Sequence, residues 1–247
     1  MEAVYDKIGK SYSAGRKADP AVFALLWRHL RGATSLLNIG AGTSSYEPDV
    51  SGVEVTALEP SLEMIRQRPV GAAPVTQAIA ESLPFGRGAF SHSMTVLSMH
   101  HWTDRKAAFA EIKRVTTTRF VAITWDPDAP RYWLTEEYFP EIHDIDSQNF
   151  PSLDEIAESF PGVVFVPLEI PADCDDGFTA AYWARPHAYL DPVVRSCMST
   201  FSKMKHAEAG LQKLRDDLNN GLWYRKHGHL QTRDSLDLGY KIAVWDV

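Results

Sequence analysis

Two glycines at the end of an apolar run are the first residues in this sequence with chemical meaning. The run LLNI is followed by Gly40 and Gly42, one residue apart. Neither glycine has a Cβ, so the main chain there can pass within contact distance of a ligand. In an open α/β sheet, the turn after the first strand borders the ligand crevice at the carboxyl ends of the strands. The pattern predicts that this turn contacts a ligand.

An acid at the tip of the next predicted strand indicates what that ligand contains. Glu59 lies roughly 20 residues beyond the glycines, the spacing at which a carboxylate accepts hydrogen bonds from both hydroxyls of a ribose. The third glycine of a dinucleotide-binding turn would fall at position 45, where Ser45 stands. The sequence therefore favours a nucleoside-containing cofactor, and S-adenosylmethionine over a dinucleotide.

Two adjacent histidines follow the fourth predicted strand, at the same edge of the sheet. If the cofactor is S-adenosylmethionine, the reaction to consider is methyl transfer from its sulfonium, an in-line displacement that depends mainly on alignment and needs no nucleophilic residue. A base helps when the acceptor is a phenol, an alcohol or a protonated amine, and histidine has a suitable pKa. His100 and His101 are therefore the predicted catalytic residues. The alternative is that they only hydrogen-bond the loop that carries them.

The elements that must position these residues alternate along the chain. Asp19 followed by Pro20 predicts a helix to about residue 31, and further helices are predicted over SLEMIRQR, capped by Ser61, and DRKAAFAEIKRV. Strands are predicted over TSLLNI, EVTALE, VTQAIA, SHSMTVLS, RFVAITW, GVVFVPLEI and YKIAVWDV. This alternation predicts an α/β fold with a Rossmann-like, seven-stranded, mostly parallel sheet, helices on both faces, and a helical or irregular cap.

The change of rhythm after Trp125 predicts the domain organisation. We expect residues 1–125 to form the cofactor-binding core and residues 161–170 and 239–247 to supply the final strands of its sheet. Residues 126–160 and 171–238 would then be cap insertions that cover the carboxyl edge of the sheet.

Aromatic residues are concentrated in the predicted cap. They either line a pocket for a flat or apolar acceptor or form the hydrophobic core of the cap itself, because small subdomains depend on aromatic burial. The residues are Trp125, Tyr132, Trp133, Tyr138, Phe139, Tyr182, Trp183 and Tyr189.

Composition limits the partners. The 247 residues carry a formal net charge of -7, which repels a phosphate backbone, so we expect no nucleic-acid substrate. We find neither a signal peptide nor an apolar run long enough to cross a membrane, and expect a cytoplasmic protein with a small-molecule acceptor as its partner. The two cysteines, Cys174 and Cys197, lack the spacing of a metal or redox motif and are predicted to be packing residues.

Three acidic or histidine-containing segments contain residue types that can bind metals. Asp126 and Asp128 with His143 have the chemistry of a hard-cation site, but their surroundings, PDPDAP, are typical of a turn. The HGH segment, which contains His227 and His229, has too few ligands for a transition metal. The acid-rich segment 172–177 is interpreted as a loop. We therefore predict no metal.

Four ordered motifs between residues 1 and 126 resemble a known family. They are NIGAGTSS at 38–45, TALEPSLEMI at 56–65, AIAESLPF at 78–85 and VLSMHHWTD at 96–104. The sequence resembles the class I S-adenosylmethionine-dependent methyltransferases, and within them the small-molecule group that includes the ubiquinone and menaquinone biosynthesis methyltransferases. The resemblance implies an enzyme that methylates an oxygen, nitrogen or carbon of a small molecule.

The resemblance also implies which residues bind the cofactor. The glycine turn would lie under the methionine part, Glu59 would hold the ribose, and the end of the fourth strand would border the methionine moiety. An N-terminal helix would fold over the cofactor, with Arg16 placed to pair with the methionine carboxylate. The implied residues are Tyr5, Tyr12, Arg16, Asn38, Gly40, Ala41, Gly42, Glu59, Pro60 and Met64 beside the adenine, Ala80 and Glu81 at its edge, and Leu97.

Three residues depart from the family pattern. Asn38 replaces the usual acid two positions before the first glycine, Ser44 replaces a third glycine, and Ile79 replaces an acid that contacts the adenine amine. These departures leave room for other functions. One is an enzyme that binds S-adenosylmethionine but catalyses a different reaction, such as cyclisation of the methionine moiety, and another is a non-catalytic binding or regulatory partner. A dehydrogenase is a more distant alternative.

Overall fold

The structure is a computed structural model that describes residues 15–48 and 51–247. Its main sheet has seven strands in the order β3-β2-β1-β4-β5-β9-β6. The strands are β1 (Ser35–Ile39), β2 (Glu54–Leu58), β3 (Val75–Thr76), β4 (Phe90–Val96), β5 (Thr116–Trp125), β6 (Val164–Pro167) and β9 (Tyr240–Asp246). A separate two-stranded sheet pairs β7 (Ile170–Pro171) with β8 (Ser235–Leu236).

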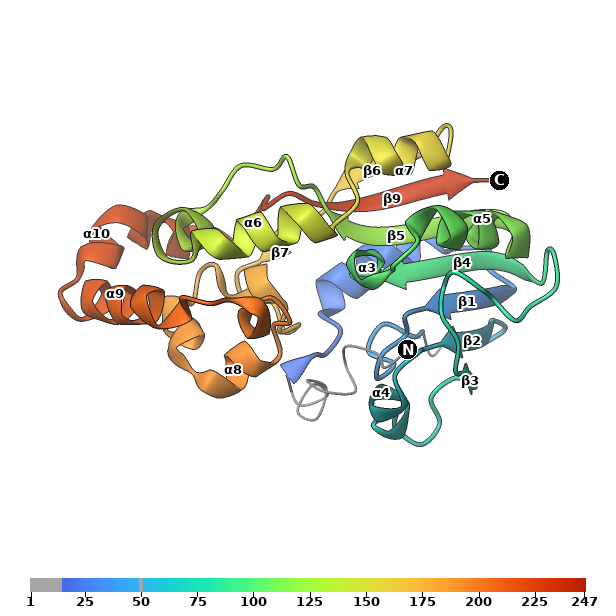
Figure 1. The fold of residues 1–247 in the computed structure, drawn as a ribbon, viewed down its shortest axis with the longest axis horizontal. Coiled ribbons are helices and arrows are strands. Elements are labelled where there is room, and N and C mark those ends of the chain that lie inside the picture. Colours follow the sequence, from blue (N-terminus) through green and yellow to red (C-terminus); the bar gives the residue numbers. More distant parts are fainter. Residues whose placement is uncertain (1–14, 49–50) are drawn as a thin grey trace.

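The main sheet is parallel except at one end. Strands β1 to β5 pair in parallel, whereas β9 is antiparallel to both β5 and β6. The carboxyl ends of the parallel strands point toward a group of helices that we call the cap (Figure 1). The cap helices are α6 (Pro140–Asn149), α8 (Pro192–Ser196), α9 (Ala207–Asn219) and α10 (Leu222–His227). The predicted α/β fold with a mostly parallel seven-stranded sheet is confirmed.

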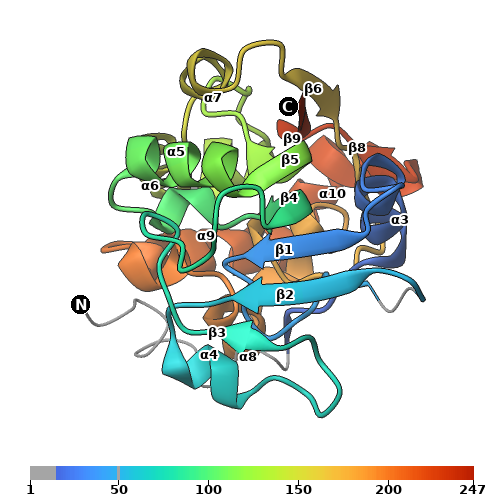
Figure 2. The same cartoon turned by 90° about the vertical axis from the view of Figure 1, so that its right-hand side faces the viewer.

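Helices cover both faces of the sheet, as predicted. Helix α3 (Pro20–His29) packs on one face, and α5 (Arg105–Val115) and α7 (Leu153–Ser159) pack on the other (Figure 2). Successive side chains of a strand point to opposite faces, so Leu36 of β1 lies in the core beneath α3 and Leu37 lies in the core beneath α5.

The predicted helix starts have the expected caps. The Asp19 carboxylate accepts hydrogen bonds from the main-chain N–H groups of Ala21 and Val22, both at 2.9 Å. Ser61 caps α4 (Leu62–Arg66) in the same way, and Asp104 caps α5. These side chains satisfy N–H groups that have no partner inside the helix.

One expectation about the core was wrong in extent. The strand predicted over VTQAIA is only Val75–Thr76, because that segment lies at the edge of the sheet and pairs with β2 alone. The described residues between β1 and β2 form turns, where a crossover helix is usual in a parallel α/β unit. Gly40, Gly42 and Ser44 all have positive φ angles, which a right-handed helix does not accommodate.

The cap has an aromatic core of its own. Trp133, Tyr138, Phe139 and Tyr189 are buried together with Leu214 and Trp223, so most of the aromatic residues that were noted in the sequence serve packing. Trp183 is buried in the core beneath α3, and Trp125 and Tyr132 line a cavity. The cap also contains short 3-10 or π turns at Leu134–Tyr138, Thr179–Tyr182, Pro186–Leu190, Phe201–Lys203 and Gly228–Thr232.

Helix α7 belongs by its packing to the sheet. Its Ile156 is buried with Phe109 of α5 and Phe120 of β5, and Phe160 after it also lies in that core. The segment 126–160, expected to be a cap insertion, thus contains a helix that covers the sheet. The domain boundaries themselves stay a prediction.

None of the helices in the described ranges is long and apolar enough to cross a membrane.

Candidate functional site

The glycine turn joins the ends of β1 and β2. The N–H groups of Gly40 and Ala41 donate to the carbonyl of Leu58 at 2.9 and 3.0 Å. Gly40 has a φ angle of 70°, and a Cβ at this position would lie 1.9 Å from the Oγ of Ser98, which follows β4. Only glycine fits between these strand ends.

Glu59 fixes the turn from the side of β2. Its side chain is buried, and its carboxylate accepts one hydrogen bond from the N–H of Gly42 at 2.8 Å and another from the N–H of Ser61 at 2.9 Å. Met64 of α4 lies beside Gly42, with its terminal methyl 3.4 Å from where a Cβ would stand. The predicted ribose acid therefore also links the glycine turn to the start of α4.

A buried polar network supports the turn near Asn38. The Asn38 amide donates to Glu47 at 3.3 Å, and Glu47 forms an ion pair with Arg68 at 2.7 Å. Arg68 in turn donates to the carbonyl of Gly42 at 3.3 Å. The amide that replaces the usual acid of the family is thus directed toward Glu47.

Beside the turn is a cavity that we call the glycine-turn hollow. It is partly open to solvent. It brings together four of the predicted cofactor residues from β1 and the turn, Arg16 from the segment before α3, and Asp176 from the segment interpreted as a loop. The described residues that line it are Arg16, Asn38, Gly40, Ala41, Gly42, Thr43, Ser45, Tyr46, Val96 and Asp176.

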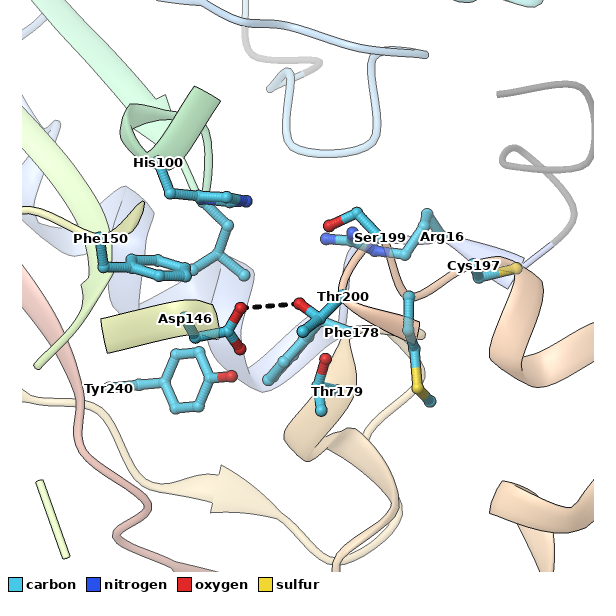
Figure 3. A pocket seen from close by; sticks show the side chains of 12 residues that line it. Arg16, His100, Asp146, Phe150, Phe178, Thr179, Cys197, Ser199, Thr200 and Tyr240 are labelled. Atoms are coloured by element: carbon cyan, nitrogen blue, oxygen red, sulfur yellow. Dashed lines mark hydrogen bonds between the residues drawn. The ribbon is translucent and has the colours of Figure 1, made fainter. Parts of the chain in front are cut away.

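A second cavity, the cap hollow, lies between the end of β4 and the cap (Figure 3). It shares Arg16 with the glycine-turn hollow and is also partly open to solvent. The predicted residues Leu97 and His100 form part of its wall. The full lining is Arg16, Leu97, His100, Asp146, Phe150, Phe178, Thr179, Cys197, Met198, Ser199, Thr200 and Tyr240.

The two predicted catalytic histidines differ in their placement. His100 lines the cap hollow and stacks on Phe150 with a ring separation of 4.2 Å, and no described residue hydrogen-bonds its Nδ1. The His101 ring packs against His100 at 3.8 Å. Burial, aided by the positive charges of Lys203 and Arg16, lowers the pKa of His101 to about 3. Burial also lowers the pKa of His100, so both rings are neutral at pH 7.

Asp146 of α6 is a titratable residue that the sequence did not single out. Its carboxylate points into the cap hollow between Tyr240 and Thr200, and the Thr200 hydroxyl donates to it at 2.7 Å (Figure 3). Burial raises the pKa of Asp146 to about 6, although Thr200 and Lys203 act in the opposite direction. No motif marks this residue, because it lies in the cap, beyond the four motifs of the core.

The remaining predicted residues lie around the ends of β2 and β3 or outside the described ranges. Pro60 follows Glu59, and Ala80 is buried after β3. The Glu81 carboxylate accepts hydrogen bonds from Thr103 at the start of α5, at 2.7 Å from its main-chain nitrogen. Ile79 is half exposed. Tyr5 and Tyr12 lie outside the described residues.

The residues weighed as metal ligands have other partners. Asp126 accepts a hydrogen bond from the N–H of Asp128 within its turn, and His143 contacts Ser147 and the carbonyl of Ala129. His227 pairs with Glu137 at 2.8 Å. Within residues 15–48 and 51–247, no group of three or more His, Cys, Asp or Glu side chains is arranged to hold a metal ion.

Comparison with known proteins identifies the family. Residues 37–119 match the family described as a methyltransferase domain. The fold matches a putative methyltransferase from an antibiotic biosynthesis pathway of Anabaena variabilis with a TM-score of 0.87 and 30% sequence identity, over 94% of this chain and 99% of that one. The chain belongs to the class I S-adenosylmethionine-dependent methyltransferases. It is an enzyme of that activity, and its cofactor is S-adenosylmethionine.

More distant matches share the fold. A geranyl diphosphate C-methyltransferase from Streptomyces coelicolor has a TM-score of 0.51 and 18% identity, over 92% of this methyltransferase and 75% of that chain. The [4+2]-cyclase SpnF has a TM-score of 0.57 and 15% identity, over 98% and 93%. No protein of curated function matches the sequence significantly.

The glycine-turn hollow has the chemistry that the cofactor requires. The amino-acid end of S-adenosylmethionine carries one negative and one positive charge, and the hollow presents a guanidinium from Arg16 and a carboxylate from Asp176. The turn itself has no Cβ at Gly40 or Gly42 that would keep the ligand from the main chain. The residues present therefore fit the cofactor.

Proposed function

We propose that this methyltransferase transfers a methyl group to an oxygen, nitrogen or carbon of a small molecule held in the cap hollow. The observation that carries the proposal is that the glycine-turn hollow and the cap hollow meet at the end of β4. Val96 lines the first, Leu97 lines the second, and Arg16 lines both. A donor in one hollow and an acceptor in the other would face each other across this point.

The cofactor would lie with its methionine part in the glycine-turn hollow. Arg16, Asn38 and the turn residues are in contact with that space, and Glu59 would hold the ribose at the end of β2. The adenine would continue along the same edge of the sheet. We propose that its faces and edge are bordered by Pro60, Met64, Ala80 and Glu81, which follow β2 and β3 in the sequence.

The protein would accelerate the reaction mainly by alignment. When bound, the cofactor would supply an electrophilic methyl group on its sulfonium, with the neutral thioether as the leaving group. Holding the two molecules in line at contact distance removes most of the entropic cost of their encounter. Leu97, held at a positive φ of 47°, and the stacked rings of His100 and Phe150 would fix the acceptor beside β4.

Two side chains are placed to manage the proton of the acceptor. His100 presents a neutral imidazole, whose Nδ1 would hydrogen-bond a hydroxyl or an amine. Its lowered pKa makes it a weak base at pH 7, so we propose that it positions the acceptor. Asp146, with a pKa of about 6, has a basicity closer to neutral pH and would take up the proton. His101 would act by holding His100 in place.

The net charge of -7 supports a small-molecule acceptor over a polyanion such as nucleic acid. We also propose a cytoplasmic location, which is supported by the two buried cysteines that remain free thiols.

The test is product analysis with the purified protein. It would be incubated with S-adenosylmethionine and a fractionated small-molecule extract, and the nucleoside products identified by mass spectrometry. S-adenosylhomocysteine that forms only with certain fractions, and not with a Glu59→Ala variant, is the expected result. Methylthioadenosine as the product would instead indicate attack on the methionine chain, and cofactor binding without turnover by any fraction would favour a binding role.

A further inference from the structure

The α-ammonium group at the amino-acid end of S-adenosylmethionine forms its strongest hydrogen bonds with a negatively charged acceptor. Strand β1 does not supply one, because Asn38 is neutral and its amide donates to Glu47. Among the described residues that line the glycine-turn hollow, the only acid is Asp176. This residue lies in the segment between β7 and the cap, far from the four motifs in the sequence.

Asp176 is held in a defined orientation. Its side chain is only 1% exposed, and its two oxygens accept hydrogen bonds from Nε and Nη2 of Arg16, the latter at 3.2 Å. The Tyr46 hydroxyl also donates to it, at 3.0 Å. Burial and the nearby Asp176 charge raise the pKa of Tyr46 well above its usual range, so Tyr46 stays a donor. A carboxylate has about four acceptor positions, so these three bonds leave capacity for another.

The main chain around Arg16 and Asp176 is closely packed, which fixes their relative position. A Cβ on Gly177 would lie 2.3 Å from the carbonyl oxygen of Gly15. Asp19, whose carboxylate caps α3, also accepts a hydrogen bond from the N–H of Asp175 at 3.1 Å. The segment before α3 and the segment that carries Asp176 are therefore joined on both sides of the Arg16–Asp176 ion pair.

We propose that the Arg16–Asp176 ion pair recognises the zwitterionic end of S-adenosylmethionine, with Asp176 binding the α-ammonium and Arg16 binding the α-carboxylate. This inference rests on the proposed seating of the methionine part in the glycine-turn hollow. It assigns to a residue outside the four motifs the negative charge that Asn38 does not provide.

Charge balance gives the physical reason for a pair. The bound cofactor carries two positive groups, the sulfonium and the ammonium, and one negative carboxylate. Arg16 alone would add a third positive charge in a largely buried place, where its repulsion of the other two is only weakly screened. Asp176 offsets this charge and adds a charge-assisted hydrogen bond to the ammonium.

The experiment measures calorimetric affinities of the full chain for three ligands: S-adenosylmethionine, S-adenosylhomocysteine and methylthioadenosine. The last has the adenine, ribose and sulfur but no amino-acid end. Asp176→Asn is expected to reduce the affinity for the first two ligands about ten- to a hundredfold, the usual effect of losing one charge-assisted hydrogen bond. The affinity for methylthioadenosine should not change. Asp175→Asn is the matched control, because this neighbouring acid is exposed, and it should alter none of the three.

Equal loss for all three ligands would show that Asp176 has only a structural role, and unchanged affinity for S-adenosylmethionine would also overturn the proposal. If the wild-type chain bound neither S-adenosylmethionine nor S-adenosylhomocysteine, the proposed function would fail instead. If the Asp176→Asn variant does not fold, a measurement on the wild-type chain still tests the proposal. An analogue of S-adenosylhomocysteine without the amino group should bind about ten- to a hundredfold more weakly than S-adenosylhomocysteine, and equal binding would refute the ammonium contact.

Discussion

Replacing Gly40 with alanine tests the geometry at the centre of the site. The added Cβ would lie 1.9 Å from Ser98 Oγ and 2.7 Å from Ser98 Cβ, so a strand end has to move. The matched control is Gly32→Ala. Gly32 also has a positive φ, 90° against 70° for Gly40, but apart from its chain neighbours no atom of the described residues lies within 4 Å of its added Cβ.

The comparison isolates the steric cost. Both variants place an L-residue in the left-handed region, at roughly 1–2 kcal/mol, and both reduce the entropy of the unfolded chain, so these contributions largely cancel. The contact with Ser98 then adds about 1–3 kcal/mol for Gly40→Ala, as overpacking usually does. For a chain of this size, that corresponds to a melting temperature about 2–12 °C below that of Gly32→Ala.

Thermal unfolding followed by circular dichroism would provide this measurement. The Ser98→Ala substitution removes the closer of the two contacts. Gly40→Ala should therefore lower the melting temperature less in the Ser98→Ala background than in the wild type. Equal melting temperatures for the two glycine variants, or no recovery in the double variant, would refute the steric reasoning. Calorimetry with S-adenosylmethionine should show lost binding for Gly40→Ala and unchanged binding for Gly32→Ala.

Three further predictions concern single side chains. Glu59→Gln leaves one acceptor oxygen for two main-chain N–H groups, so it should lower the melting temperature. It should also reduce the affinity for S-adenosylmethionine about ten- to a hundredfold in calorimetry, and an affinity equal to that of the wild type would refute the ribose contact. Ser44 has a φ angle of 83°, so Ser44→Gly should stabilise the fold by about 0.5–1 kcal/mol in urea unfolding, and a loss of stability would contradict this. Because the pKa of Asp146 is raised from 3.8 to about 6, the wild type should lose up to about 3 kcal/mol of stability between pH 4 and pH 6 relative to Asp146→Asn, and parallel pH profiles of the two proteins would contradict the shift.

The core of the fold was predictable because its signals are local. Asp19 and Pro20 mark the start of α3, Ser61 marks the start of α4, and the apolar run before Gly40 marks β1. Each signal depends on residues within a few positions of one another. The meeting of the glycine turn with Glu59 was also predictable, because each follows a strand and the carboxyl ends of parallel strands lie at one edge of the sheet.

The contents of the cap were not predictable in this way. Its aromatic residues were compatible with both a pocket and a core, and only packing shows that Trp133 and Tyr189 are buried with one another while Tyr132 reaches a cavity. Helix α7 lies in the segment that was expected to belong to the cap, and only its contacts with Phe109 and Phe120 show that it covers the sheet.

The sequence by itself determined the sheet, the glycine turn, the acid at the end of β2 and, through the four motifs, the family and the cofactor. Only the tertiary structure placed Asp146 in the same cavity as His100 and brought Asp176 into contact with Arg16. Arg16 and Asp176 are 160 residues apart, and the spacing of residues within a motif carries no information about such a contact. Their burial and mutual distance arise from packing between distant segments, which is why an acid in a loop such as ADCDDG could be interpreted from its sequence only as a loop.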